Sequence, residues 1–96
     1  MNIRKEIITI KDSIIKWRRD FHEYPELAFK EHRTGDVILK ELRSMGMEPK
    51  EKVGKTGVTA DLQFGDGPMI GLRADMDALP IKETSGLDFS SKNEGV

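Results

Sequence analysis

The stretch from Met69 to Glu83, MIGLRADMDALPIKE, restricts the fold of this chain more than any other. It opens with an apolar run, MIGL, which is typical of a strand buried on both faces. Polar residues then take alternate positions. Because side chains alternate across a strand, Arg73, Asp75 and Asp77 are predicted to point the same way. Pro80 has no N–H for a sheet ladder, so a central strand has to end before it.

This charged face has two interpretations. Charge at the end of a buried strand is costly unless it is paired or used. A structural pair of Arg73 with an aspartate would satisfy that requirement. Alternatively, Asp75 and Asp77 are functional groups, since neighbours on one strand face lie roughly 6–7 Å apart and can converge on one bound atom. The residues alone leave both interpretations open.

Composition narrows the function classes. Ninety-six residues are enough for one small domain, and the net charge of −1 lacks the basic surplus of a nucleic-acid binder. The chain contains no cysteine, which excludes disulfides and thiolate metal ligands within these residues. No apolar run approaches the roughly 18 residues of a membrane span, and the N-terminus mixes charges into its apolar positions, unlike a signal peptide. We therefore expect a cytoplasmic protein without nucleic-acid or membrane partners.

Two helices are predicted in the first half. Apolar residues recur at helical spacing over 3–21, which indicates an amphipathic helix of about five turns. The segment before Pro25 ends it, because the residue before a proline avoids the helical region. His22, at that end, is interpreted as a capping or structural residue rather than a ligand. A second helix is predicted over 31–45, closed by Gly46 in the left-handed conformation.

The second half is predicted to form strands. Residues 48–53 are typical of a short edge strand, and residues 58–64 alternate between apolar and polar. The glycine-rich turn at 65–67 then predicts that 58–75 forms an antiparallel hairpin. The fold class expected is α/β, with two N-terminal helices followed by a sheet that contains an antiparallel hairpin.

An aspartate-dependent phosphotransfer domain is an alternative function. In such domains a buried strand ends in Asp-x-Asp, where one carboxylate attacks phosphorus and the other handles the proton. Asp75 and Asp77 have this outline. Arg73 interrupts the apolar run, Leu79 stands where a threonine or valine is usual, and the motif comes late in the chain, so this interpretation is the weaker one.

Two segments together resemble one family. RRDFHEYPEL at 18–27 and LRADMDALPI at 72–81 resemble the two N-terminal signatures of the aminoacylase/hippurate hydrolase family of metal-dependent amidohydrolases. The resemblance implies a zinc-peptidase-like α/β/α layered catalytic domain. It also implies that residues 1–96 are the N-terminal part of that domain, without its remainder and without the dimerisation or lid domain. A homo-oligomer is compatible with it.

The resemblance also implies a chemistry. Members of this family cleave the amide bond of N-acyl amino acids or related peptides with a water activated by a divalent metal, zinc or manganese. Their metal ligands and catalytic glutamate match positions beyond Val96. The 96 residues alone are therefore expected to bind no catalytic metal tightly and to be inactive. A truncated non-catalytic segment or interaction module is the alternative.

Three residues of this chain match the family's site region. Asp75 and Asp77 match positions where more distant relatives carry His-x-Asp, a metal-binding histidine followed by the aspartate that orients it. The resemblance therefore assigns Asp77 the orientation of a metal-bound imidazole. Because this chain has aspartate where those relatives have the metal-binding histidine, the resemblance assigns Asp75 no direct metal-ligand role. Arg73 would offset the repulsion between the two carboxylates.

Overall fold

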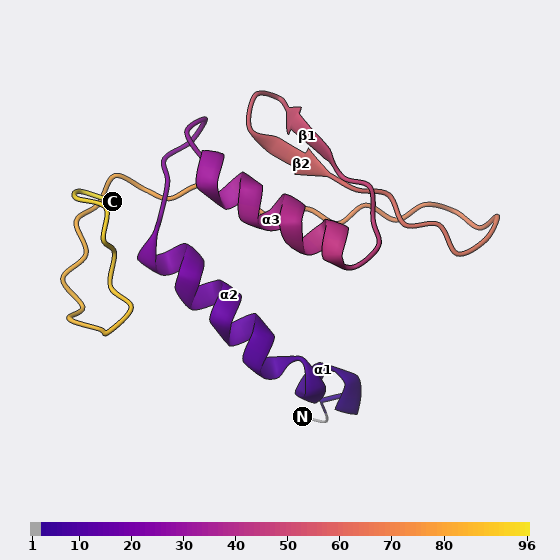
Figure 1. The fold of residues 1–96 in the computed structure, drawn as a ribbon, viewed down its shortest axis with the longest axis horizontal. Coiled ribbons are helices and arrows are strands. Elements are labelled where there is room, and N and C mark those ends of the chain that lie inside the picture. The colour runs from indigo at the N-terminus through magenta and orange to yellow at the C-terminus, as the bar shows by residue number, and fades with distance from the viewer. Residues whose placement is uncertain (1–2) are drawn as a thin grey trace.

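The computed structural model describes residues 3–96 and contains helices followed by a small sheet (Figure 1). The β-strands form one antiparallel pair that lies over the third helix. In chain order the elements are α1 (Lys5–Thr9), α2 (Lys11–Glu23), α3 (His32–Ser44), β1 (Lys50–Val53) and β2 (Gly57–Thr59). This order agrees with the predicted fold class. No helix in the range 3–96 is long and apolar enough to cross a membrane.

The first predicted helix is two helices, because the chain bends at Ile10. The hydroxyl of Thr9 donates to the carbonyl of Glu6 at 2.6 Å, and the N–H of Ile10 bonds three residues back to Ile7 rather than four. A threonine that bonds back to the preceding turn bends a helix, and a three-residue bond tightens it. The predicted end before Pro25 is confirmed, since α2 stops at Glu23.

The second predicted helix is confirmed to within one residue at each end. It is α3, and Gly46 follows it with φ of 83°, in the left-handed region. One face of α3 packs on β2, and the buried side chains among residues 3–96 lie on α3 or directly before it. Leu39 is the buried apolar residue, with 5% of its surface exposed, and Thr34 and Glu31 are buried beside it. This core is small, so polar contacts have to contribute to it.

A buried carboxylate joins the sheet to α3. Glu31 precedes the helix, and Thr56 in the β1–β2 turn donates its hydroxyl to Glu31 Oε2 at 2.5 Å. That hydrogen bond is the main reason why the pKa of Glu31 lies below its ordinary value. Burial opposes this shift but does not outweigh it. The charged form is therefore kept inside the α3–β2 junction by its hydrogen bonds.

The predicted hairpin over 58–75 is wrong. The hairpin that forms is β1–β2, with Lys50 opposite Thr59 and Val53 opposite Gly57. The chain does bend at 65–67 as predicted, but residues 60–77 contain no strand. A two-stranded hairpin is marginal unless its apolar face is covered. The apolar side chains of the predicted hairpin are not covered, since Phe64 is 91% and Leu72 97% exposed.

Two glycines give a matched test of the α3–hairpin junction. A Cβ on Gly57 would lie 2.5 Å from the carbonyl oxygen of Val53, whereas one on Gly35 would lie 3.6 Å from that of Thr56, an ordinary contact. We predict that Gly57→Ala lowers the free energy of unfolding by about 1–3 kcal/mol through overpacking. Gly35→Ala should raise it by about 0.5–1 kcal/mol, because alanine favours the helix. Urea denaturation followed by circular dichroism measures both, and equal effects would contradict this geometry.

The exposed apolar residues in 60–72 predict self-association. Exposed apolar surface on an unpaired extended segment favours pairing with another chain. We expect the sedimentation coefficient to rise with protein concentration. Leu72→Ser should reduce that rise, and Gln63→Ser, a control at another exposed position of the same segment, should not. A chain that stays monomeric at the highest concentration reached would show that this surface is inert.

Candidate functional site

The charged face predicted from the sequence is partly assembled. Arg73 Nη2 donates to Asp75 Oδ1 at 2.9 Å, and these side chains are 88% and 72% exposed. An ion pair this exposed contributes little to stability, because water screens it. Asp77 is also exposed. The three charged residues are therefore not buried at a strand end as expected, and the Arg73–Asp75 pair is solvated.

These three residues lie along an open groove of about 1180 Å³. The segment 72–79 lines the groove together with residues of α3, β2 and the end of α2, and residues between 81 and 96, Glu83 and Ser91 among them, line it as well. Apolar side chains predominate along it, among them Phe21, Ile38, Leu42, Met47, Val58 and Met76. The groove therefore combines an apolar lining with the two carboxylates and the guanidinium of residues 73–77.

The described residues do not form a metal centre by themselves. Within residues 3–96 no three side chains of His, Cys, Asp or Glu come together closely enough to hold an ion. Asp75 is engaged by Arg73, which competes with any cation for its oxygen atoms. A hydrolytic zinc or manganese site needs three or four ligands around the ion. The donors among residues 3–96 do not fit such a site.

A denser polar cluster surrounds Glu83, which the sequence did not single out. Glu83 accepts hydrogen bonds from His22 Nε2 at 2.9 and 3.0 Å, from the N–H of Ser91 at 2.7 Å, and from the hydroxyl of Ser85. The Ser85 hydroxyl, His22 and the Ser91 N–H, in that order, lower the pKa of Glu83 to about 2. The cluster therefore keeps this carboxylate ionised.

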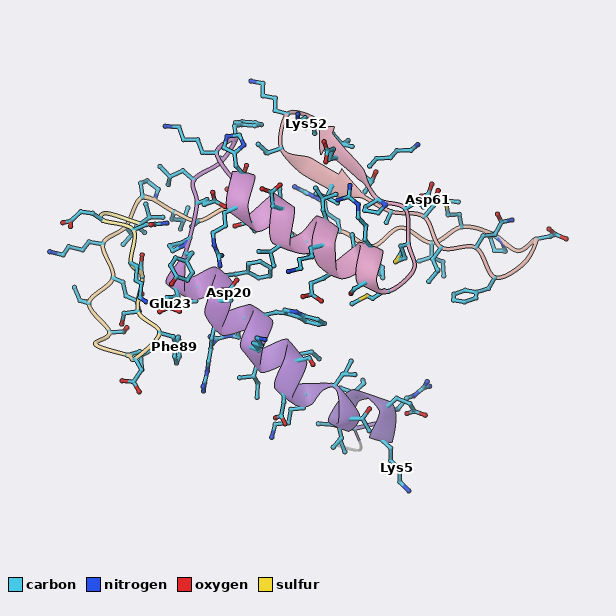
Figure 2. The ribbon with its side chains drawn as sticks, in the orientation of Figure 1. Lys5, Asp20, Glu23, Lys52, Asp61 and Phe89 are labelled. Atoms are coloured by element: carbon cyan, nitrogen blue, oxygen red, sulfur yellow. The ribbon has the colours of Figure 1, made fainter. Side chains whose placement is uncertain are left out.

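His22 was predicted to be a structural residue rather than a ligand; the structure pairs its ring with Glu83, and the absence of a ligand role stays a prediction. His22 lies in the last turn of α2, and its ring meets that of Phe89 edge-on with centroids 5.5 Å apart. The guanidinium of Arg19 lies 4.8 Å from the centre of the same Phe89 ring. Figure 2 shows Phe89 beside the end of α2, near Glu23. No local pattern in the sequence indicates the His22–Glu83 pair, since the two residues are 61 positions apart.

The end of α2 is also joined to α3. Asp20 accepts two hydrogen bonds from the guanidinium of Arg33, at 2.8 and 3.1 Å. Both oxygens of Glu26 accept backbone N–H groups at the start of α3, from Arg33 at 3.0 Å and Thr34 at 2.6 Å. Burial raises the pKa of Glu26, but these hydrogen bonds outweigh it, so that the pKa lies below its ordinary value. Residues 18–27, which resemble a family signature, thus serve as a structural junction.

Comparison with known proteins gives a consistent class. The chain is 43% identical over 97 residues to a hippurate hydrolase of Campylobacter jejuni, covering 100% of this chain and 25% of that protein. It is 41% identical over 96 residues to an N-acyl-L-amino acid amidohydrolase of Geobacillus stearothermophilus, covering 98% and 26%. No family model matches the chain.

A solved structure agrees with these relatives. The YxeP protein of Bacillus subtilis, described as a dinuclear metal binding peptidase from the M20 family, superposes with a TM-score of 0.84 at 43% identity, over 91% of this chain and 25% of that one. A putative glutamate–cysteine ligase of Rhodococcus jostii is 47% identical over 83 residues, but this match covers only 10% of that protein. Most of that ligase lies outside the matched region, so its name says little about the part that this chain resembles.

The matches define a class of metal-dependent amidohydrolases and peptidases. Within it, the chain belongs to the aminoacylase/hippurate hydrolase family, as its two signatures predicted. It spans about a quarter of the length of the hydrolases that it matches.

The Glu83 cluster predicts an unusual titration. A carboxylate whose pKa is depressed in the folded state contributes stability that is fully present above its unfolded pKa and is lost as pH falls through the folded value. The contribution of the ionised Glu83 carboxylate to folding stability is therefore complete above pH 4.5 and is lost on acidification toward about pH 2. We expect the carboxyl carbon resonance of Glu83 to titrate with a midpoint near the lower value. A midpoint near 4.5 would show that the hydrogen bonds do not hold in solution.

Proposed function

We propose that this chain is the N-terminal part of the catalytic domain of a metal-dependent amidohydrolase, which cleaves the amide bond of N-acyl amino acids or related peptides. One observation carries the proposal. Nearly the whole chain aligns at 41–43% identity with amidohydrolases of that description, and its fold superposes on a dinuclear metal binding peptidase. Identity at this level over whole elements supports a shared chemistry more strongly than fold likeness alone.

In this proposal Asp77 is the residue of the chain nearest to the chemistry. Its carboxylate accepts the free ring N–H of a histidine that binds the metal, which fixes the tautomer and orientation of the imidazole. Asp75 and Arg73 balance the local charge, as their 2.9 Å contact supports. Since the donors for a metal are not assembled within residues 3–96, no step of the reaction is assigned to these residues.

Two other functions have less support. The phosphotransfer interpretation needs a buried strand before Asp75, and the residues of that segment are exposed and form no strand. A non-catalytic module is favoured by one observation, the lack of a metal donor cluster among the described residues. Turnover of an N-acyl amino acid that depends on a divalent metal separates the enzyme from the module.

The test is a hydrolysis assay on a protein that carries this chain together with the remaining three quarters of the family's length. We expect Asp77→Asn to lower kcat/KM by roughly 10–100-fold, because the loss of a ligand-orienting carboxylate has that effect. Asp61→Asn, an exposed aspartate on the same extended region, is the matched control and should leave the rate unchanged (Figure 2). If Asp77→Asn lowers thermal stability as much as activity, Asp77 has a structural role instead.

Calorimetric titration of the 96-residue chain with zinc and manganese complements the assay. Two carboxylates beside a guanidinium hold a divalent ion only weakly, so we expect no stoichiometric binding in the sub-micromolar range. Tight binding that Asp75→Ala abolishes would show that these residues hold more of the metal site than their geometry indicates.

A further inference from the structure

Residues 78–93, near the end of the chain, are fastened to the end of α2 and the turn after it. Segment 78–93, which we call the docked segment, contains no helix or strand of its own. It therefore has no internal ladder of hydrogen bonds to hold its shape. Its position depends on contacts with residues 19–27, and Figure 1 shows it as the orange-to-yellow loop beside the α2–α3 turn.

The docked segment begins at a backbone contact one residue after Asp77. The N–H of Ala78 donates to the carbonyl of Glu26 at 2.8 Å, and Ala78 forms an isolated parallel bridge with Leu27. This contact sets where the charged stretch 73–77 ends. We call this backbone hydrogen bond the Glu26–Ala78 pivot. It keeps Ala78 close to Glu26, but it does not fix the direction in which the stretch 73–77 runs from that point.

The far end of the docked segment is held by a second group of contacts. Lys92 donates its backbone N–H to the carbonyl of Glu23 at 2.8 Å, and its ammonium lies 2.8 Å from Glu23 Oε1. Asn93 donates its side-chain N–H to the carbonyl of Pro25 at 2.7 Å. Both side chains are largely exposed, so water competes for these contacts.

Glu83 lies between the two ends of the docked segment. Its carboxylate binds His22 on α2 and the backbone N–H of Ser91 at the same time. Its side chain is 17% exposed, the least of the groups in these ion pairs. Glu83 Oε1 accepts hydrogen bonds from His22 Nε2 on α2 and from the N–H of Ser91. Glu83 Oε2 accepts hydrogen bonds from His22 Nε2 and from the hydroxyl of Ser85. The carboxylate thus closes the loop 83–91 on itself and fastens it to α2. Charged hydrogen bonds are stronger than neutral ones.

We propose that Glu83 is a positioning residue, whose contacts with His22 and Ser91 fix the direction in which the 73–77 stretch, with Asp77, leaves the Glu26–Ala78 pivot. The proposal rests on the proposed function for the importance of where Asp77 lies. It extends that function by making residues 22 and 83 part of the apparatus that holds the candidate site. It also gives the histidine of the first signature a role that needs no metal.

The experiment measures a distance in the metal-free chain. Because the chain contains no cysteine, spin labels can be placed selectively at Ser13→Cys on α2 and Ala74→Cys beside Asp75, both exposed. Pulsed electron resonance gives the distribution of distances between the labels. In the otherwise unchanged chain we expect one narrow distribution. Glu83→Gln keeps the size of the side chain but removes its charge, and should cause the loss of that narrow distribution while the circular dichroism of α2 and α3 is unchanged.

Further variants keep the result interpretable. Ser91→Pro removes the N–H donor from the loop side, together with the Ser91 hydroxyl that bonds the backbone of Asn93, and leaves Glu83 and α2 intact. It should broaden the distribution in the same way, and Ser91→Ala, which removes the hydroxyl alone, should leave it narrow. Asp88→Asn, an exposed carboxylate in the same loop, should leave it narrow. If Glu83 contributed only stability, the folded chain would keep its narrow distribution in both test variants.

Unchanged distributions in Glu83→Gln and Ser91→Pro would overturn the positioning role, even if a longer protein hydrolyses N-acyl amino acids. Conversely, a failure of the hydrolysis assay leaves the distance result as it stands, because neither metal nor substrate enters this measurement. If Glu83→Gln fails to fold, the Ser91→Pro distribution alone supports the proposal by broadening or overturns it by staying narrow.

Discussion

The arrangement of this chain depends on Glu26 more than on any other residue. Its carboxylate accepts two N–H groups at the start of α3, and its main-chain carbonyl accepts the N–H of Ala78. The first turn of a helix has N–H groups without internal partners, and a negative charge there is favourable. One residue thus determines where α3 begins and where the chain returns fifty residues later. The small apolar core, with Leu39 as its buried hydrophobic residue, could not determine both.

The residues around Glu26 reinforce the same junction. The ring of Tyr24 has the guanidinium of Arg33 at 4.3 Å and the ammonium of Lys92 at 5.4 Å from its centre. Arg33 also pairs with Asp20 through two hydrogen bonds, which raises the pKa of Arg33. One aromatic ring therefore contacts cations from α3 and from the docked segment. Residues 18–27, which resemble a signature of a hydrolase family, therefore connect α2, α3 and the docked segment through packing and polar contacts.

How far the sequence predicts this structure depends on how local each interaction is. The spacing of apolar residues predicts α2 and α3 well, because helical periodicity and the Pro25 and Gly46 boundaries are encoded within a few positions. The hairpin over 58–75 was predicted from an equally local pattern and is wrong, because a strand also needs partners and cover. The Arg73–Asp75 contact follows from alternation along one segment. The Glu83 cluster could not be found this way, because its partners come from α2 and from a loop without periodicity.

The separation of those partners has a consequence for the order of folding. The contact between His22 and Glu83 closes a loop of 61 residues, and Lys92 and Asn93 meet Tyr24 and Pro25 across 68 positions. Contacts within α2, α3 and the β1–β2 turn are short in sequence and form before such long closures. During synthesis, the end of α2 leaves the ribosome long before the residues that bind it. This surface is therefore complete and exposed to solvent while the second half of the chain is still being made.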